Sequence, residues 1–150
     1  MTRNTDRGLS PRCHTLRGMA NETSNPGRPG APVTWFEIGS DDPAGARHFY
    51  GELFGWSFAV EGPYSIITTG PDHRLQGGVQ DTSAPLPDGT PRSYAIPCVE
   101  VDDVAATCDR VVELGGKVIV PATAIPAGLV YAHVADPAGA HIGLYRPPSG

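Results

Sequence analysis

The sequence predicts an α+β fold built from two tandem β-α-β-β-β modules, and three observations support it. Displacing the chain by 61 residues aligns "SDDPAGARHFYGELFGWSF" with "VDDVAATCDRVVELGGKVI". In each half an amphipathic helical pattern follows a strand-like segment, and three short alternating segments follow the helix. One half cannot bury its sheet face alone, so the two are expected to share a core. The folded domain is assigned to residues 31–150, with modules at about 33–81 and 93–147.

In the first module, "VTWFEIGS" alternates its side chains between two faces and predicts a strand. Asp42 is the expected helix N-cap, Pro43 the first helical residue and Gly55 the left-handed stop. The helix carries an apolar stripe that is expected to face the core: Ala46, Phe49, Tyr50, Leu53 and Phe54. The segments "WSFAV", "YSIITTG" and "LQGGVQ" then predict three strands.

In the second module, Asp103 begins the predicted helix, Gly115 and Gly116 end it, and its stripe consists of Val104, Cys108, Val111 and Val112. The strands "KVIV", "LVYAHVA" and "HIGLYR" follow. The tetrapeptide "DPAG" begins the first helix at 42–45, but at 136–139 it is predicted to turn a β-hairpin, so its recurrence reflects turn chemistry. The segment 121–130 is interpreted either as a lid or as an ordinary connection.

Charge and hydropathy exclude two kinds of partner. Residues 31–150 carry six basic and 14 acidic side chains, whereas nucleic-acid binding needs a basic surface. No apolar run approaches the roughly 18 residues that cross a membrane. Residues 1–30 are rich in Arg and poor in apolar side chains, so a disordered tail without a secretory signal is expected, with Met19 a second candidate start.

The three cysteines, Cys13, Cys98 and Cys108, have no paired spacing. This pattern argues against a disulfide framework or a zinc knuckle, and it favours a cytoplasmic location. Cys98 and Cys108 are expected to be buried and unreactive. No phosphate-binding Gly-rich loop, nucleophile elbow or HExxH sequence is present, so no cofactor is expected.

The stretches "WFEI…DDP..A..FY.ELFGW" and "VDDV……ELGGKV……DPAG" resemble the vicinal oxygen chelate superfamily, which includes glyoxalases, extradiol dioxygenases and bleomycin-resistance proteins. The resemblance covers residues 33–146 and is strongest to small glyoxalase-like proteins. It implies that the two modules form a curved, cup-like mixed sheet around a shared hollow. It also implies a homodimer, with the edge of the first module as a candidate contact.

The resemblance further implies four inward metal-ligand positions, on the first and last strands of each module. These positions fall at Trp35, Gly78, Ile96 and Gly143. None of the four side chains can coordinate a divalent cation, so the usual metal centre is expected to be absent. The two glycines are expected to enlarge the hollow, and Trp35 to provide an aromatic wall.

Strand parity places further side chains on the same face as these positions: Glu37, Gln76, Cys98, Glu100 and His141, with Tyr64, Tyr131 and Tyr145 as aromatic lining. Burial beside apolar walls would disfavour the charged form of Glu37, which makes it the candidate general base. The alternative is a Glu37 that reaches solvent or an Arg. His133 and His141 form either a metal or acid–base pair or, as we prefer, a cross-strand polar pair at a sheet edge.

These observations favour a small-molecule-binding protein without the usual metal centre, which sequesters or transforms an organic metabolite or antibiotic. The alternative is a metal-dependent lyase, isomerase or dioxygenase of the same superfamily. Its metal would be displaced onto Glu37, Gln76, Glu100 and His141, whose surrounding shell would have to be rebuilt. Metal content and ligand binding are the measurements that separate the two.

Overall fold

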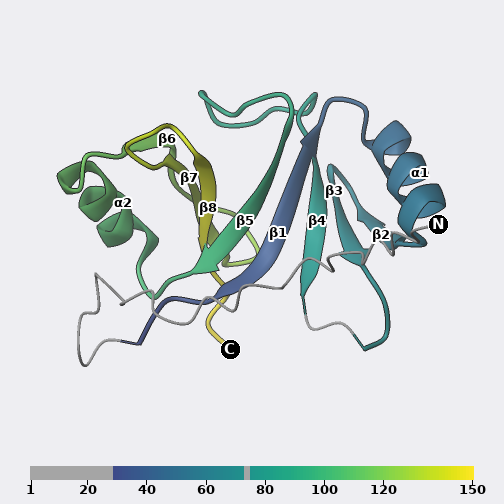
Figure 1. Cartoon of the computed structure of the whole chain (residues 1–150), viewed down its shortest axis with the longest axis horizontal. Helices are drawn as coiled ribbons and strands as arrows, with labels where there is room; N and C mark the ends of the chain where they lie inside the picture. Colours follow the sequence, from purple (N-terminus) through teal and green to yellow (C-terminus); the bar gives the residue numbers. More distant parts are fainter. Residues whose placement is uncertain (1–28, 73–74) are drawn as a thin grey trace, which may run out of the picture.

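The described part of the chain forms two helices and eight strands, which Figure 1 labels. The computed structural model describes residues 29–72 and 75–150, so the expected tail falls almost wholly outside the described residues. The elements of the first module are β1 (Val33–Ser40), α1 (Pro43–Phe54), β2 (Ser57–Glu61), β3 (Tyr64–Thr68) and β4 (Gln76–Asp81). Those of the second are β5 (Tyr94–Glu100), α2 (Val104–Glu113), β6 (Lys117–Ala124), β7 (Val130–Ala135) and β8 (His141–Arg146).

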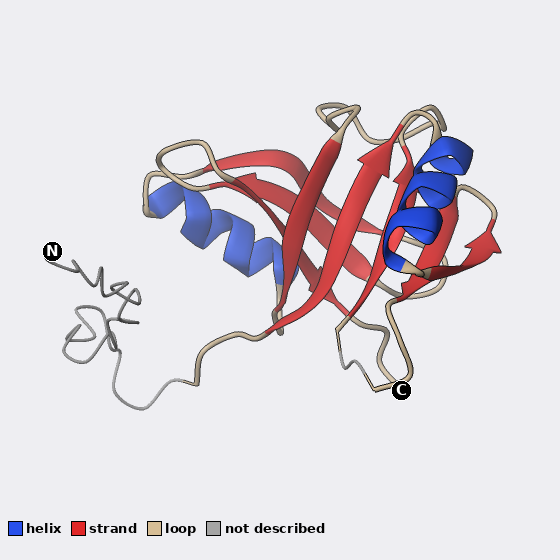
Figure 2. Ribbon diagram, turned by 45° about the vertical axis from the view of Figure 1, so that its right-hand side comes forward, coloured by secondary structure: helices blue, strands red, loops and turns tan. Residues whose placement is uncertain are grey.

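All eight strands belong to one mixed sheet in the order β2-β3-β4-β1-β5-β8-β7-β6. Within the modules β1 runs parallel to β4 and β5 parallel to β8, and the antiparallel pair β1–β5 joins the two modules. The sheet curves, and the two helices lie on its outer side at opposite ends (Figures 1 and 2). The predicted α+β fold of two tandem β-α-β-β-β modules is therefore confirmed.

Both helices begin where the sequence predicts. The side chain of Asp42 accepts a hydrogen bond from the Gly45 amide at 3.0 Å, and Asp103 accepts one from the Ala106 amide at 3.0 Å. Each aspartate thereby satisfies one of the amides that a helix leaves unpaired at its start. Gly55 ends α1 at φ 70°, a conformation that glycine adopts without steric cost.

The expectation of one shared apolar core is wrong, because each module has its own. Under α1 the buried cluster consists of Ile38, Ile67 and Val79. Under α2 it consists of Val104, Cys108, Ala132, Val134 and Leu144. Each helix covers the outer face of its own half of the sheet, so the modules are united by the β1–β5 hydrogen bonds rather than by a common core.

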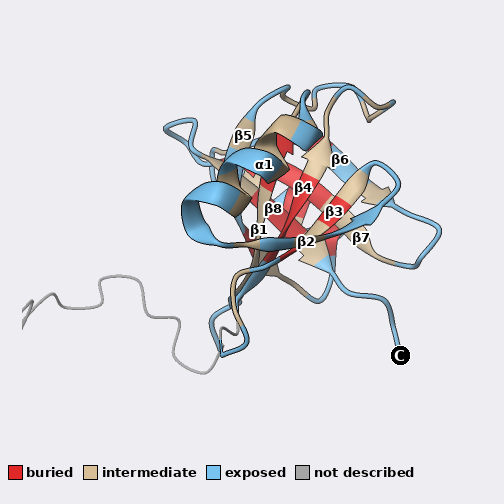
Figure 3. Cartoon of the chain, turned by 90° about the vertical axis from the view of Figure 1, so that its right-hand side faces the viewer, coloured by how far each residue is buried: buried red, intermediate tan, exposed pale blue. Residues whose placement is uncertain are grey.

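The predicted stripe of α1 is also only partly correct. Ala46 and Tyr50 pack against the sheet, but Phe49 and Phe54 are 57% and 55% exposed, as is Leu53 at 58%. Figure 3 shows much of α1 in the pale blue of exposed residues. The space beneath the helix is filled instead by Trp56, which lies beyond the helix end and whose ring centroid is 5.5 Å from that of Tyr50.

The segment 121–130 forms the end of a β-hairpin rather than a lid or a long connection. Strand β6 continues to Ala124, which pairs with Val130, and only a tight turn closed by Gly128 separates β6 from β7. The second "DPAG" forms the predicted hairpin turn, with Gly139 at φ 96° and its amide bonded to the Asp136 carbonyl at 2.9 Å. Within the described ranges, neither helix has the length and apolarity to span a membrane.

Candidate functional site

The inner, concave face of the sheet collects the predicted site residues because strand register aligns them. One cross-strand row runs Gln76, Trp35, Cys98, Gly143 and His133 over β4, β1, β5, β8 and β7. Glu37 lies two residues beyond Trp35 on β1 and therefore on the same face. It is opposite Gly78 on β4 and Ile96 on β5.

Glu37 lies at the centre of this face and is held by neutral donors. Its Oε2 accepts a hydrogen bond from the Tyr64 hydroxyl at 3.1 Å, and its Oε1 accepts one from the Tyr94 hydroxyl at 2.7 Å. The Nε2 atom of His133 is 3.6 Å from Oε1. The Glu37 side chain is 18% exposed, so it does not extend into bulk water. Among the described residues it forms no ion pair with an Arg.

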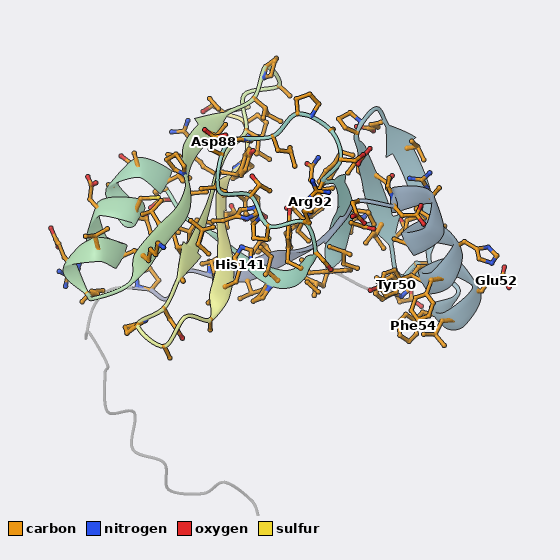
Figure 4. All side chains as sticks on the ribbon, turned by 90° about the horizontal axis from the view of Figure 1, so that it is seen from above. Tyr50, Glu52, Phe54, Asp88, Arg92 and His141 are labelled. Atoms are coloured by element: carbon orange, nitrogen blue, oxygen red, sulfur yellow. The ribbon has the colours of Figure 1, made fainter. Side chains whose placement is uncertain are left out.

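Polar contacts extend from Glu37 in both directions. The Trp35 Nε1 donates to the Tyr64 hydroxyl at 3.0 Å, and His141 Nε2 is 3.0 Å from His133 Nδ1. His133 is only 3% exposed, whereas His141 is half-buried and is labelled near the middle of the molecule in Figure 4. We call the connected residues the Glu37 network: Trp35, Glu37, Tyr64, Tyr94, His133 and His141.

The glycines of this face make room for neighbouring side chains and do not enlarge the hollow. A Cβ atom at Gly78 would meet the Tyr64 ring, and one at Gly39 would meet the Tyr94 ring. At Gly143 it would lie 2.7 Å from the Cys98 Sγ. Both phenols therefore lie across glycine backbone, which lets their hydroxyls reach Glu37.

Burial controls the protonation of the site. Desolvation, followed by the nearby Glu37 charge, raises the pKa of Tyr64 and of Tyr94 well above the usual tyrosine value. Both hydroxyls therefore remain protonated donors at neutral pH. Desolvation and then Glu37 raise the pKa of Cys98 to about 12, so its thiol remains neutral and unreactive as a nucleophile. Desolvation, with His133 next, lowers the pKa of His141.

Glu100 belongs to a separate cluster. Its Oε2 accepts a hydrogen bond from Thr34 at 3.0 Å and lies 3.4 Å from the Tyr145 hydroxyl, which also contacts Thr34. Glu100 is four residues beyond Ile96, the partner of Glu37, which is about 13 Å along an extended strand. The structure therefore does not bring Glu37 and Glu100 together into one displaced metal site.

The residues present do not fit the superfamily's metal. The positions that the resemblance assigns as ligands hold an indole, an isoleucine and two glycines, and Tyr64 and Cys98 occupy the space beside the glycines. Across 29–72 and 75–150, no group of three or more His, Cys, Asp or Glu side chains has an arrangement suited to a metal ion.

The prediction from sequence missed Tyr94 and misplaced His133. Parity could have found Tyr94, because it shares a face with Ile96, Cys98 and Glu100 on β5. The two histidines do form the expected cross-strand contact, but not at a sheet edge, because β7 lies between β6 and β8. Tyr131 borders the network through a ring-centroid distance of 5.9 Å to His133.

A separate shallow hollow of about 450 Å³ lies on the outer side of the sheet, beside the start of α1. Its lining combines apolar side chains, such as Ile38 and Phe49, with the polar Ser40, Asp42 and Ser93. Tyr94 is the one member of the Glu37 network that borders it. The hollow is open to solvent and lacks the buried polar groups that orient a ligand, so the concave face is the stronger candidate.

Fold and sequence together define the class of protein. The sequence profile described as "Glyoxalase/Bleomycin resistance protein/Dioxygenase superfamily" matches residues 33–144. The chain belongs to this superfamily.

Two proteins with similar sequences extend this comparison. The chain is 34% identical over 128 residues to CFP32 of Mycobacterium tuberculosis, which its name presents as a presumed glyoxylase; the match covers 79% of this chain and 46% of CFP32. It is 35% identical over 132 residues to the anthracycline biosynthesis protein DnrV of Streptomyces peucetius, covering 79% of this chain and 47% of DnrV. The chain thus spans about half the length of these relatives.

Solved structures agree on the fold alone. Methylmalonyl-CoA epimerase from M. tuberculosis superimposes with a TM-score of 0.53 at 16% identity, covering 82% of this chain and 95% of the epimerase. A Legionella pneumophila structure described as an NAD-dependent benzaldehyde dehydrogenase gives a TM-score of 0.56 at 14% identity, covering 75% and 97%.

Proposed function

We propose that this chain binds a small, partly aromatic organic molecule on its concave face, without the divalent metal of the superfamily's metalloenzymes, and sequesters or transforms it. One observation carries the proposal: the four positions assigned to metal ligands hold Trp35, Gly78, Ile96 and Gly143. The neighbouring Tyr64 and Cys98 pack against the two glycines, so a substitution at those positions alone would not restore a ligand set.

The composition of the face supports an aromatic ligand. Trp35, Tyr64 and Tyr94 belong to the network and Tyr131 borders it. Aromatic side chains with a few placed polar groups are typical of small-molecule sites. The 35% identity to an anthracycline biosynthesis protein supports a ligand of the antibiotic or secondary-metabolite kind.

Proton transfer is the transformation that the geometry supports best. The two phenol hydrogen bonds fix the orientation of the Glu37 carboxylate, which is the group that would take a proton from the ligand. His133 adjoins Glu37, and His141 connects it to the partly exposed part of the face. The pair would pass the proton between the carboxylate and solvent.

Metal analysis and ligand binding test the proposal. Protein purified without chelator should contain no stoichiometric zinc, nickel, manganese or iron by elemental analysis. A series of anthraquinones should include a ligand that raises Tm by about 5–10 °C at about 100 times its Kd, where mass action contributes about 2.7 kcal/mol. Glu37→Gln should retain binding of a neutral anthraquinone and lose any turnover, and the exposed Glu61→Gln is the matched control.

Stoichiometric metal whose removal abolishes ligand binding would refute the metal-free proposal and favour the metalloenzyme. Turnover that survives Glu37→Gln would remove the role of Glu37 as base. Binding without turnover by the wild-type chain favours sequestration.

We also propose a homodimer formed through the first module. Phe49, Leu53 and Phe54 are exposed on α1, and Val60 is exposed on the neighbouring edge strand β2. Figure 4 shows Tyr50 and Phe54 together at this end of the molecule. Exposed apolar and aromatic side chains gathered near a sheet edge are typical of a protein–protein contact.

A further inference from the structure

Charge is distributed unevenly over the concave face. Strand register puts three carboxylates on it, Glu37, Glu61 and Glu100, and one basic side chain, Lys117. Glu61 and Lys117 are exposed on the edge strands β2 and β6. The interior of the face therefore carries two negative charges from Glu37 and Glu100, with no Lys or Arg between them in the part of the chain that the structure describes.

Among the residues that the structure describes, neither interior carboxylate has a permanent counter-ion. Glu37 is bonded to the two phenols and adjoins His133, which is charged only when protonated. Glu100 is bonded to uncharged hydroxyl groups. Among the described residues, the ion pairs formed by arginine involve Asp41 and Glu113, both on the surface.

The negative charge of a partly buried carboxylate without a counter-ion is only partly compensated. Removing a charge from water costs several kcal/mol, which hydrogen bonds offset only in part. A carboxylate has roughly four lone-pair sites, and the phenols fill two of those on Glu37. It can therefore accept further donors from a ligand.

The aromatic rings near Glu37 favour a positively charged ligand. The rings of Trp35, Tyr64 and Tyr94 are connected directly to Glu37 or to one another by hydrogen bonds, and Tyr131 adjoins His133. Aromatic faces attract ammonium and related cations through the ring quadrupole. A carboxylate bordered by aromatic rings is a suitable site for an organic ammonium group.

Resting on the proposed function, we propose that the ligand of the concave face is an organic cation: an aromatic molecule with a protonated amine that contacts Glu37. The protonated amine supplies a counter-ion for Glu37 and donates hydrogen bonds to its remaining lone pairs. The aromatic part of the ligand packs against the neighbouring rings. A ligand with a carboxylate or phosphate would instead face the like charges of Glu37 and Glu100.

Three anthracenes that differ only in the group at carbon 9 test this proposal by fluorescence titration. The aminomethyl compound, a cation at pH 7, should bind about tenfold more tightly than the neutral hydroxymethyl compound, and the carboxylate should bind most weakly. Glu37→Gln should reduce the preference for the amine to about threefold or less. Glu61→Gln, which removes an exposed carboxylate of the same face, should leave it unchanged.

The outcomes separate this proposal from the proposed function. Three results would each overturn the cation proposal alone. They are equal affinity for amine and alcohol, tightest binding of the carboxylate, and an unchanged preference for the amine in a folded Glu37→Gln variant. The absence of binding by all three compounds up to about 1 mM would overturn both proposals. If the Glu37→Gln variant shows no cooperative melting transition, it is not folded and is set aside. The relative affinity of the wild-type chain for the amine and the alcohol then tests the cation proposal.

Discussion

Replacing Gly78 with alanine should break the Glu37 network from a position that bears no functional group. The new Cβ would meet the Oη and Cζ atoms of Tyr64, so the ring has to move off the β4 backbone. Movement of the ring removes the hydrogen bond from Trp35 at 3.0 Å and the bond to Glu37 at 3.1 Å.

The expected loss of stability is about 4 kcal/mol. The neutral Trp35–Tyr64 bond contributes about 1 kcal/mol, and the bond to the Glu37 carboxylate about 1.5 kcal/mol. Inserting a methyl group into a packed region adds about 1–3 kcal/mol. For a domain of this size the total corresponds to a fall in Tm of about 10–15 °C.

Urea denaturation of the variant, and of the same change in a Tyr64→Ala background, measures this effect. Without the Tyr64 ring the added methyl has nothing to displace, so Gly78→Ala should then cost about 1 kcal/mol or less. Gly51→Ala, within α1, is the control: its Cβ would lie 3.5 Å from the Trp56 carbonyl oxygen and 3.6 Å from the Phe58 ring, which are ordinary contacts. It should stabilise by about 0.5–1 kcal/mol. An undiminished cost of Gly78→Ala in the Tyr64→Ala background would refute the reasoning.

Two further predictions concern pH and association. The pKa of His141 is lowered in the folded chain from its usual value of 6.5, so the unfolded chain binds more protons. Stability should therefore fall as pH drops through that value, and the fall should be smaller in His141→Gln; identical pH profiles from urea titrations would contradict this. Light scattering after size-exclusion chromatography at about 50 μM should give twice the 15.7 kDa chain mass, and Leu53→Asp should give a monomer. A monomeric wild-type chain would argue against the dimer.

The residue pattern was sufficient to predict the fold, because the features that mark helix ends and strands are local in the sequence. Asp42 and Asp103 cap the helices, Gly55 stops the first one, and alternation defines the strands. The 61-residue repeat then gave the order of elements twice. The same local reasoning misjudged Phe49, because helical periodicity indicates an apolar face without indicating how much sheet lies beneath it.

Strand parity could also assign Trp35, Glu37 and Cys98 to one face, since side chains alternate along every strand. It could not determine which side chains on that face touch. The contact between His133 and Glu37 depends on the curvature of the sheet, which brings together side chains from β7 and β1 although two strands lie between them.

The amino-acid sequence by itself determined the two modules and the starts of their helices, because these are properties of residue type and spacing. The replacement of the superfamily's metal ligands stays a prediction from the resemblance. Only the tertiary structure decided that the glycines accommodate the rings of Tyr64 and Tyr94 and that Glu37 receives both hydroxyls. Such contacts join strands distant in sequence, and packing across the curved sheet sets their distances.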